Sequence, residues 1–389
     1  MEESEGGLTF DPERQALARR REGEALRLGL SGFALFLLLV FLTLPSGLTL
    51  RLEGWALSLT RNPWAVVALY VVVGYLTLTA LALPLRVVGR RSDVRYGMSR
   101  QSWSSWALDR GKATLLGLLF ALAAVGALYW TLRNFGTFWW LVFWLLSLAF
   151  TLLAGILGPV VLLPLFYRVE EIRDGGMQAR LQALSRRAGV RALGVYEFRS
   201  SAKTERGAAA VAGWGRTRRI LLSDHILREY APEEVEGILA HELAHHVQRD
   251  PARFLLLSAV LSLLALWGMN RFVQATMGVF AIASLAQVAN LPLFVLFGGL
   301  FYAATGPLSR SFSRWREGLA DQKAAELSRN PEALARALVK LHDQNLSVAD
   351  PHPWVERLFY THPRGTRRLR NLLRLRPGMH DDSQYPKKD

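Results

Sequence analysis

The 389-residue sequence contains no cysteine. This absence excludes disulfide bonds, thiolate zinc sites, a cysteine nucleophile, and a prenyl or palmitoyl anchor on the chain itself. Any bound metal must therefore be held by histidine and carboxylate side chains. The sequence also lacks internal repeats and low-complexity tracts.

Hydrophobic residues make up 51% of the chain and charged residues only 20%, which excludes a disordered protein. The apolar residues collect into runs of about 20, the length at which a helix crosses a hydrocarbon core about 30 Å thick. Six runs are expected to be membrane spans: residues 28–48, 63–85, 113–132, 138–166, 254–269 and 281–308. The sequence therefore predicts a polytopic membrane protein.

The formal net charge of +15 comes from arginines scattered between the runs, not gathered on a nucleic-acid-binding module. We therefore expect no nucleic-acid partner. Lysine and arginine are retained on the cytoplasmic side of short loops. The connection 86–112 carries Arg90, Arg91, Arg95, Arg100 and Arg110, whereas the alternate connections carry only Arg51 with Arg61, Arg133 and Arg271. This pattern predicts six spans with both termini in the cytoplasm.

This topology places two polar segments on the same cytoplasmic face, where they can build one site together. The expected organisation is a cytoplasmic tail (1–27), a four-span region (28–166), a first cytoplasmic segment (167–253), two spans (254–308), a second cytoplasmic segment (309–375) and a disordered tail (376–389). The predicted fold class is mainly α, with a membrane helix bundle and a composite cytoplasmic domain.

Residues 231–246 carry the strongest chemical signal. Pro232 and the acidic residues after it are typical of a helix start. In that helix His241 and His245 are four residues apart, so both imidazoles leave one face and can share a metal ion. A catalytic zinc takes a third protein ligand and retains a water whose pKa falls to about 7. Glu242 is placed to accept a proton from that water.

A third ligand is expected from the residues just after the sixth run. There Glu317 and Asp321 are again four apart. One can bind the metal while the other accepts a hydrogen bond from the second nitrogen of a ligand histidine. The alternative is an exposed helix whose acids balance Arg314 and Arg316. Zinc hydrolases commonly combine two histidines with one glutamate, which favours the metal interpretation.

Four segments occur in a fixed order: HELAH at 241–245, RWREGLAD at 314–321, ALVKLHDQNL at 337–346 and YTHPRGTRRL at 360–369. In these segments the chain resembles the integral-membrane CAAX prenyl endopeptidases, which are zinc metalloproteases of the gluzincin type. The likeness extends from about the second span to near Leu373. It implies a gluzincin-like cytoplasmic domain with a small β-sheet, to which a strand at 219–224 would belong.

The resemblance also implies residue roles. His241, His245 and Glu317 would bind Zn²⁺, Glu242 would be the general base, and Asp321 would orient a ligand histidine. His362 and Arg368 would face the substrate near the scissile carbonyl, where a donor and a fixed cation stabilise developing negative charge. The alternatives are that His362 is a turn residue before Pro363, and that Arg368 lies on a solvated basic helix face.

The sequence departs from the family on the strand expected beside the substrate. The family usually carries Asn-Ala-Tyr or a similar sequence there, whereas residues 208–215 read AAAVAGWG. Ala208, Ala209 and Ala210 can still bind an extended peptide through their backbone, as an exposed strand edge does. Peptide cleavage remains the expectation, but the substrate preference of the family does not follow.

The predicted function is that of a membrane-embedded zinc metalloendopeptidase whose partners are the bilayer and membrane-associated peptides or proteins. By resemblance, these substrates would be lipidated, with CAAX-type prenylated C-termini. A second hypothesis is a quality-control protease for misfolded membrane proteins, similar to the heat-shock membrane metalloproteases. A metal transporter is less favoured because the apolar runs contain almost no ionisable residues. A scaffold without catalytic activity would not explain the presence of Glu242 beside two metal ligands.

Overall fold

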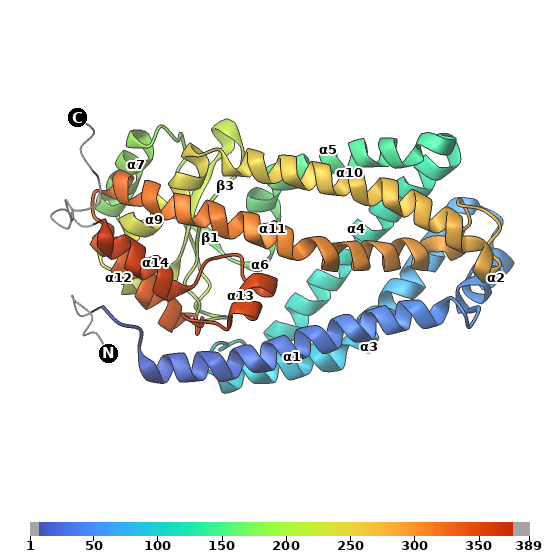
Figure 1. Ribbon diagram of the computed structural model, residues 1–389, viewed down its shortest axis with the longest axis horizontal. Helices are drawn as coiled ribbons and strands as arrows, with labels where there is room; N and C mark the ends of the chain where they lie inside the picture. Colours follow the sequence, from blue (N-terminus) through green and yellow to red (C-terminus); the bar gives the residue numbers. More distant parts are fainter. Residues whose placement is uncertain (1–7, 376–389) are drawn as a thin grey trace, which may run out of the picture.

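The structure, a computed structural model, describes residues 8–375. Long helices run along the longest axis of an elongated molecule, and a sheet with shorter helices gathers at one end (Figure 1). Six segments of the described chain are long and apolar enough to cross a membrane, which confirms the predicted helix bundle. Their main helices are α1 (Pro12–Thr43), α3 (Pro63–Arg95), α4 (Trp103–Asn134), α5 (Trp139–Leu157), α10 (Asp250–Thr276) and α11 (Leu291–Ser328).

The long N-terminal helices begin at side chains that satisfy their first backbone N–H groups. Asp11 accepts hydrogen bonds from the backbone of Glu13 and Arg14 before α1, and Asn62 accepts them from two residues of α3. A proline follows each of these caps, where its missing N–H costs nothing. Ser102 caps α4 in the same way.

Two features of the bundle were not predicted. A short helix, α2 (Leu48–Leu59), lies between the first two spans. The fourth span ends in a π-helical stretch, Gly158–Leu162, followed by α6 (Leu163–Phe166). Pro159 lies in the π-helical stretch and Pro164 lies in α6. Because proline cannot donate a backbone hydrogen bond, the regular α-helical hydrogen-bond pattern is interrupted there.

Residues 12–27, predicted to belong to a tail, form the first turns of α1. This part of the helix packs against the polar domain: Ala18 is fully buried, and the Gln15 side chain binds Asp343 Oδ1 and the Ala349 N–H at 2.9 Å each. The charged residues of this segment therefore belong to a helix that packs against the polar domain. The predicted disordered tail, 376–389, lies outside the described residues.

The two polar segments fold together, as the composite-domain prediction requires. The domain contains α7 (Gly175–Arg187), α8 (Asp224–Glu229), α9 (Pro232–Val247), α12 (Pro331–Gln344), α13 (Pro353–Phe359) and α14 (Gly365–Arg374). Its core combines side chains from both segments, including Leu222, Leu239, Leu243, Ala320, Leu334 and Leu372. Burial of these apolar side chains joins chain segments separated by two membrane spans.

A four-stranded mixed sheet completes the domain. Its strands are β1 (Val169–Glu171), β2 (Val195–Phe198), β3 (Ala209–Ala212) and β4 (Arg219–Ser223), in the order β1-β2-β4-β3. β4 runs parallel to β2 and antiparallel to β3. The predicted strand at 219–224 is therefore present, and β3 is an edge strand.

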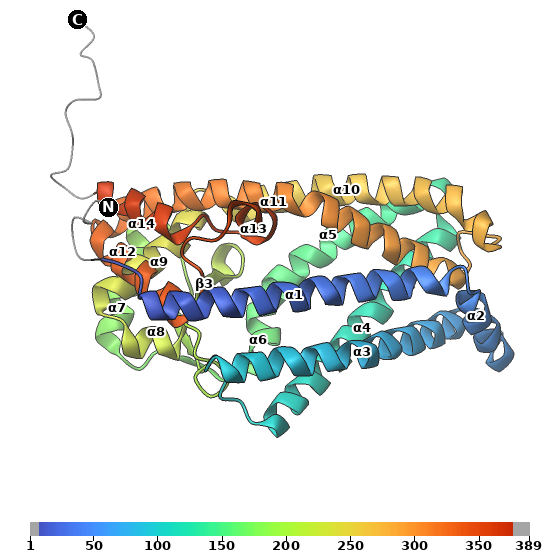
Figure 2. The ribbon, with the colours of Figure 1, turned by 60° about the horizontal axis from the view of Figure 1, so that its bottom comes forward.

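Figure 2 shows the start of α1, the end of α3 and the polar domain at one end of the molecule, with α2 at the other. An even number of spans accounts for this arrangement, because the chain returns to the domain end after every second one. The two polar segments and the start of α1 therefore share one side of the bundle.

Candidate active site

The H-E-x-x-H sequence lies on α9, as predicted. Pro232 occupies the first turn, and the Glu234 carboxylate reaches back to accept a hydrogen bond from the Ala231 N–H at 3.0 Å. α9 packs against α11 and α12. At Gly237 an added Cβ would lie only 3.0 Å from Leu334 Cα, so the missing side chain allows α9 and α12 to approach closely.

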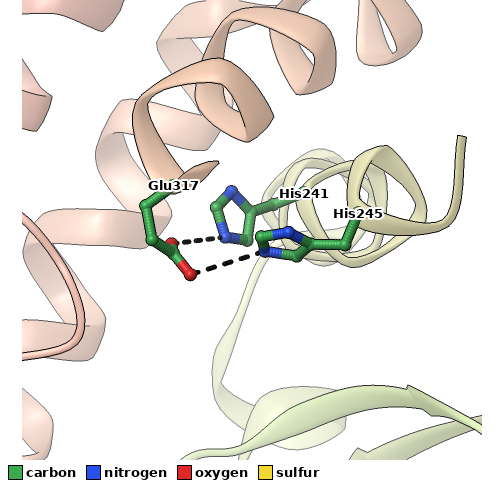
Figure 3. Close-up of side chains that lie close together, drawn as sticks. All are labelled: His241, His245 and Glu317. Carbon is green, nitrogen blue, oxygen red and sulfur yellow. Dashed lines mark ion pairs between the residues drawn. The ribbon is translucent and has the colours of Figure 1, made fainter. Parts of the chain in front are cut away.

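α11 brings Glu317 to the two histidines of α9. The Glu317 carboxylate faces both imidazoles (Figure 3), with Oε2 at 3.2 Å from His241 Nε2 and Oε1 at 3.5 Å from His245 Nε2. One potential ligand atom from each residue lies within 4.8 Å of the others. The structure thus brings together the three residues predicted as metal ligands.

These distances fit a metal ion. Ligand atoms placed tetrahedrally about 2.0–2.2 Å from zinc are separated from one another by about 3.3–3.6 Å. Glu317 Oε2 is also a buried oxygen that accepts no hydrogen bond from any residue in the described part of the chain. A buried carboxylate oxygen without a donor is costly, and a cation bound there would remove that cost.

Charge around His241 also favours a cation. Burial opposes the charged form of this imidazole, but the carboxylates of Asp321 and Glu317 outweigh it and raise the pKa of His241 to about 10. Two carboxylates beside one imidazole favour a bound cation, either a proton on the ring or a metal ion. His241 Nδ1 lies 3.0 Å from Asp321 Oδ1, where the predicted orienting carboxylate was expected.

Glu242, the predicted general base, follows His241 on α9. It makes no hydrogen bond or ion pair with any other residue of the described chain. Burial raises the pKa of its carboxyl group above the usual range, against the opposing charges of the two histidines. A carboxylate with a raised pKa and no competing partner is suited to accept and return a proton.

Asp250, at the start of α10, is a site residue that the sequence interpretation missed. Its Oδ2 lies 2.9 Å from His245 Nδ1, and its Oδ1 accepts a hydrogen bond from Arg316 Nε at 2.5 Å. Arg316 is 3% exposed, so the alternative in which it lies on an exposed helix face is wrong. Each imidazole thus has its own carboxylate behind it.

The two residues predicted from the last motif also lie at the site. His362 Nε2 is 3.3 Å from Glu317 Oε1, and this side chain is half-exposed. Arg368 is buried and donates to both oxygens of Asp321, at 2.8 and 2.7 Å. The alternative of a solvated basic face is therefore wrong for Arg368. Its described contacts make it a positioning residue for Asp321, and a direct contact with substrate stays a prediction.

The backbone of β3 is open along one side. Ala208 O accepts a hydrogen bond from Ser223 N in β4 at 2.8 Å. Because bonding alternates along an antiparallel pair, Ala209 and Val211 direct their backbone groups away from β4. Val211 O already accepts a hydrogen bond from His246 Nε2 at 2.9 Å. Among the three alanines predicted to bind substrate, Ala209 is thus the one whose backbone faces outward.

A second unpredicted contact fixes the approach to β3. The Asn345 side chain accepts a hydrogen bond from Gly207 N at 3.0 Å and donates one to Gly207 O at 3.1 Å. This pair of bonds ties the end of α12 to the residue two positions before the strand. The segment 337–346 contributed to the family resemblance, but the sequence predicted no role for Asn345. Its role depends on Gly207, which is 138 positions away.

A membrane helix bundle with an H-E-x-x-H helix and a glutamate on a second helix has the arrangement of a membrane metalloprotease. Residues 171–376 match the model of Peptidase family M48, and residues 9–168 match that of the CAAX prenyl protease N-terminal region with five membrane helices. Because the first match covers more than half of the chain, the chain belongs to peptidase family M48.

Individual relatives support this family assignment. An uncharacterized metalloprotease, YhfN, of Bacillus subtilis (strain 168) is 29% identical over 329 residues, covering 84% of this chain and 77% of that protein. A CAAX prenyl protease 1 homolog of Oryza sativa subsp. japonica is 24% identical over 284 residues, covering 72% of this chain and 66% of its own length. The crystal structure of S. mikatae Ste24p shares the fold, with a TM-score of 0.83, 19% identity and coverage of 95% of this chain and 92% of that one.

The chain is therefore a metalloprotease of the membrane. Family membership implies a metal cofactor and peptide or protein substrates. The six apolar helices make the lipid bilayer its surroundings. Membership of a peptidase family also favours the enzyme interpretation over a metal transporter.

Proposed function

We propose that the protein is a zinc endopeptidase that cleaves membrane-associated or lipidated proteins, with CAAX-type prenylated C-termini as one substrate class. The observation that carries the proposal is the convergence of His241 and His245 on α9 with Glu317 on α11 (Figure 3). Two imidazoles and one carboxylate, in a chain without cysteine, form a donor set that suits zinc.

The bound zinc supplies Lewis-acid chemistry and lowers the pKa of a water molecule. Glu242 accepts a proton from the attacking water and passes it to the leaving amine. Asp321 and Asp250 hold the imidazoles of His241 and His245 in one orientation and tautomer. His362 donates a hydrogen bond to the oxygen of the scissile carbonyl as negative charge develops there.

We place the polar domain and the site in the cytoplasm. The segment 86–112, which joins the apolar runs of α3 and α4, lies at the domain end of the bundle and carries more basic residues than the other short connections between apolar runs. Under the positive-inside rule, this end faces the cytoplasm. A site at the cytoplasmic ends of the spans favours substrates that are themselves held at the membrane surface.

Cleavage assays test this function directly. The purified protein is incubated with a farnesylated CAAX peptide, the same peptide without the lipid, and an unfolded soluble protein. We expect the highest kcat/KM for the farnesylated peptide, loss of activity with a chelator, and recovery with zinc. Faster cleavage of the unfolded protein would favour the quality-control alternative, and no cleavage of any of the three by zinc-loaded protein would reject the proposal.

The open edge of β3 leads to a prediction about substrate binding. In Ala209→Pro the outward N–H disappears, while the bonds of Ala208 and Ala210 to β4 remain. We expect kcat/KM for a peptide to fall by up to about tenfold with an unchanged melting temperature, because one hydrogen bond to substrate is lost. Ala210→Pro is the matched variant, and it should lower the melting temperature because a bond within the sheet is lost. Unchanged kcat/KM in Ala209→Pro would exclude peptide pairing at this residue.

A further inference from the structure

A cavity of about 630 Å³ has a lining that includes none of the three metal-binding residues. It lies between the domain end of α3, the start of α4 and the loop that leads into β3. Its lining includes Arg86, Arg90, Trp106, Arg110, Lys203 and Arg206. None of these six residues belongs to the metal-binding site, but the lining also includes Ala208, which precedes β3 and is one of the alanines predicted to bind substrate. We name this space the arginine cavity.

The arginine cavity carries an excess of positive charge. It is lined by five cationic side chains and two carboxylates, Asp93 and Asp109. Both carboxylates are already paired: Asp109 with Lys203 at 2.6 Å, and Asp93 with Arg21 at 2.8 Å and Arg206 at 3.5 Å. The remaining cations are Arg86, Arg90 and Arg110, and no carboxylate of the described chain lies within 4.0 Å of their guanidinium groups.

Arg90 donates hydrogen bonds to Ser99 Oγ at 3.4 Å and to the Gln101 carbonyl oxygen, but one nitrogen of Arg90 and one of Arg110 remain without a partner among the described residues. Arg90 is only 6% exposed, and its guanidinium lies 4.6 Å from the ring centroid of Trp103. Arg110 lies 5.7 Å from the centroid of Trp106. The Nε atoms of Arg90 and Arg110 are buried and have no hydrogen-bond partner within residues 8–375. A buried guanidinium without a counter-charge is costly, so an anion bound here would stabilise the folded protein.

The position of the cavity along the spans indicates where this anion comes from. The apolar run of α3 ends at Leu85, and that of α4 starts at Ala113. Arg90 lies four residues beyond Arg86, a helical rise of about 6 Å. This distance matches the polar headgroup region, about 5–7 Å thick on each side of the hydrocarbon core. The exposed Trp103 is also typical of this layer.

We propose that the arginine cavity binds the phosphate of an anionic glycerophospholipid. Arg86, Arg90 and Arg110 bind the phosphate oxygens, and the acyl chains lie against the apolar surface of α3 and α4. Guanidinium groups suit this role because they match phosphate geometry and are weakly hydrated. Basic pockets between spans on the cytoplasmic side are known places for lipid headgroups. The inference does not depend on the proposed protease specificity.

Binding to lipid vesicles tests the proposal. The full chain is reconstituted into phosphatidylcholine vesicles with increasing fractions of phosphatidylglycerol, and its melting temperature is recorded. We expect the melting temperature to rise with the anionic lipid, because ligand binding to the folded state stabilises it. In Arg86→Gln and in Arg110→Gln, about ten times more phosphatidylglycerol should be needed for the same rise in melting temperature, as expected for a lost charged hydrogen bond.

Arg91→Gln is the matched control. Arg91 is exposed on the same helix but does not line the cavity. It should behave like the wild type. If all three variants respond equally, the effect is general surface attraction and the proposal is wrong. In separate samples without phosphatidylglycerol, the protein is given inorganic phosphate alone, a peptide with a free C-terminal carboxylate, or the same peptide with a C-terminal amide. Full stabilisation by phosphate, or by the carboxylate peptide but not by its amide, would also overturn the proposal.

Discussion

Glu242→Gln is expected to lower kcat/KM for a peptide substrate by about 10²–10⁴-fold while leaving metal binding intact. The amide of glutamine has nearly the shape of the carboxylate but cannot accept a proton at neutral pH. Because the Glu242 side chain forms no hydrogen bond or ion pair with any residue of the described chain, the exchange breaks none in the fold. Hydrolysis assays with metal analysis of the same samples measure both effects.

Glu233→Gln is the control for this variant. Glu233 lies on the same helix but pairs with Arg180 on the outer face, at 2.9 Å. It should retain activity close to that of the wild type. If Glu242→Gln with a full complement of metal cleaved peptide at the wild-type rate, Glu242 would not be the base. If the variant lost its metal, the loss of activity would instead show that Glu242 is needed for metal binding.

The part of the site that could be predicted is the part that helix periodicity determines. His241 and His245 share a face because they are four residues apart on one helix, and no tertiary information is needed for that step. The same spacing relates Glu317 to Asp321. The roles of these two acids were separated by the family resemblance, and the structure places Glu317 beside both imidazoles and Asp321 behind His241.

The residues that were missed depend on contacts between elements. Asp250 reaches His245 because the chain turns sharply between α9 and α10, at Arg249 with a left-handed φ of 58°. No spacing rule connects a histidine with an aspartate five residues later on the next helix. Asn345 likewise acts on a residue far away in the sequence. Such contacts follow from the packing of helices, which composition and periodicity do not define.

Hydrophobicity predicted the six spans but not the secondary structure of the polar residues next to them. Residues 12–27 have no long apolar run, yet they continue the first span as one helix. A favourable cap at Asp11 and contacts of Gln15 with the polar domain stabilise this extension. Apolar runs therefore define the membrane-embedded length of a helix and not its ends.

Asp250→Ala is the variant for which we expect the largest loss of stability. It leaves the guanidinium of Arg316 buried without its carboxylate, and removing one partner of a buried ion pair typically costs about 3–5 kcal/mol. It also removes the partner of His245 Nδ1, so metal affinity should fall about 10–100-fold. Thermal unfolding and metal titration of the purified protein measure these two losses separately.

A second substitution separates the two roles of Asp250. In Asp250→Ala combined with Arg316→Met, the unpaired buried charge is gone, and we expect most of the stability to return. Metal affinity should stay low, because His245 still lacks the carboxylate that fixes its tautomer. If metal affinity recovered together with stability, Asp250 would act only through the fold. If neither recovered, the ion pair with Arg316 would not be the source of the instability.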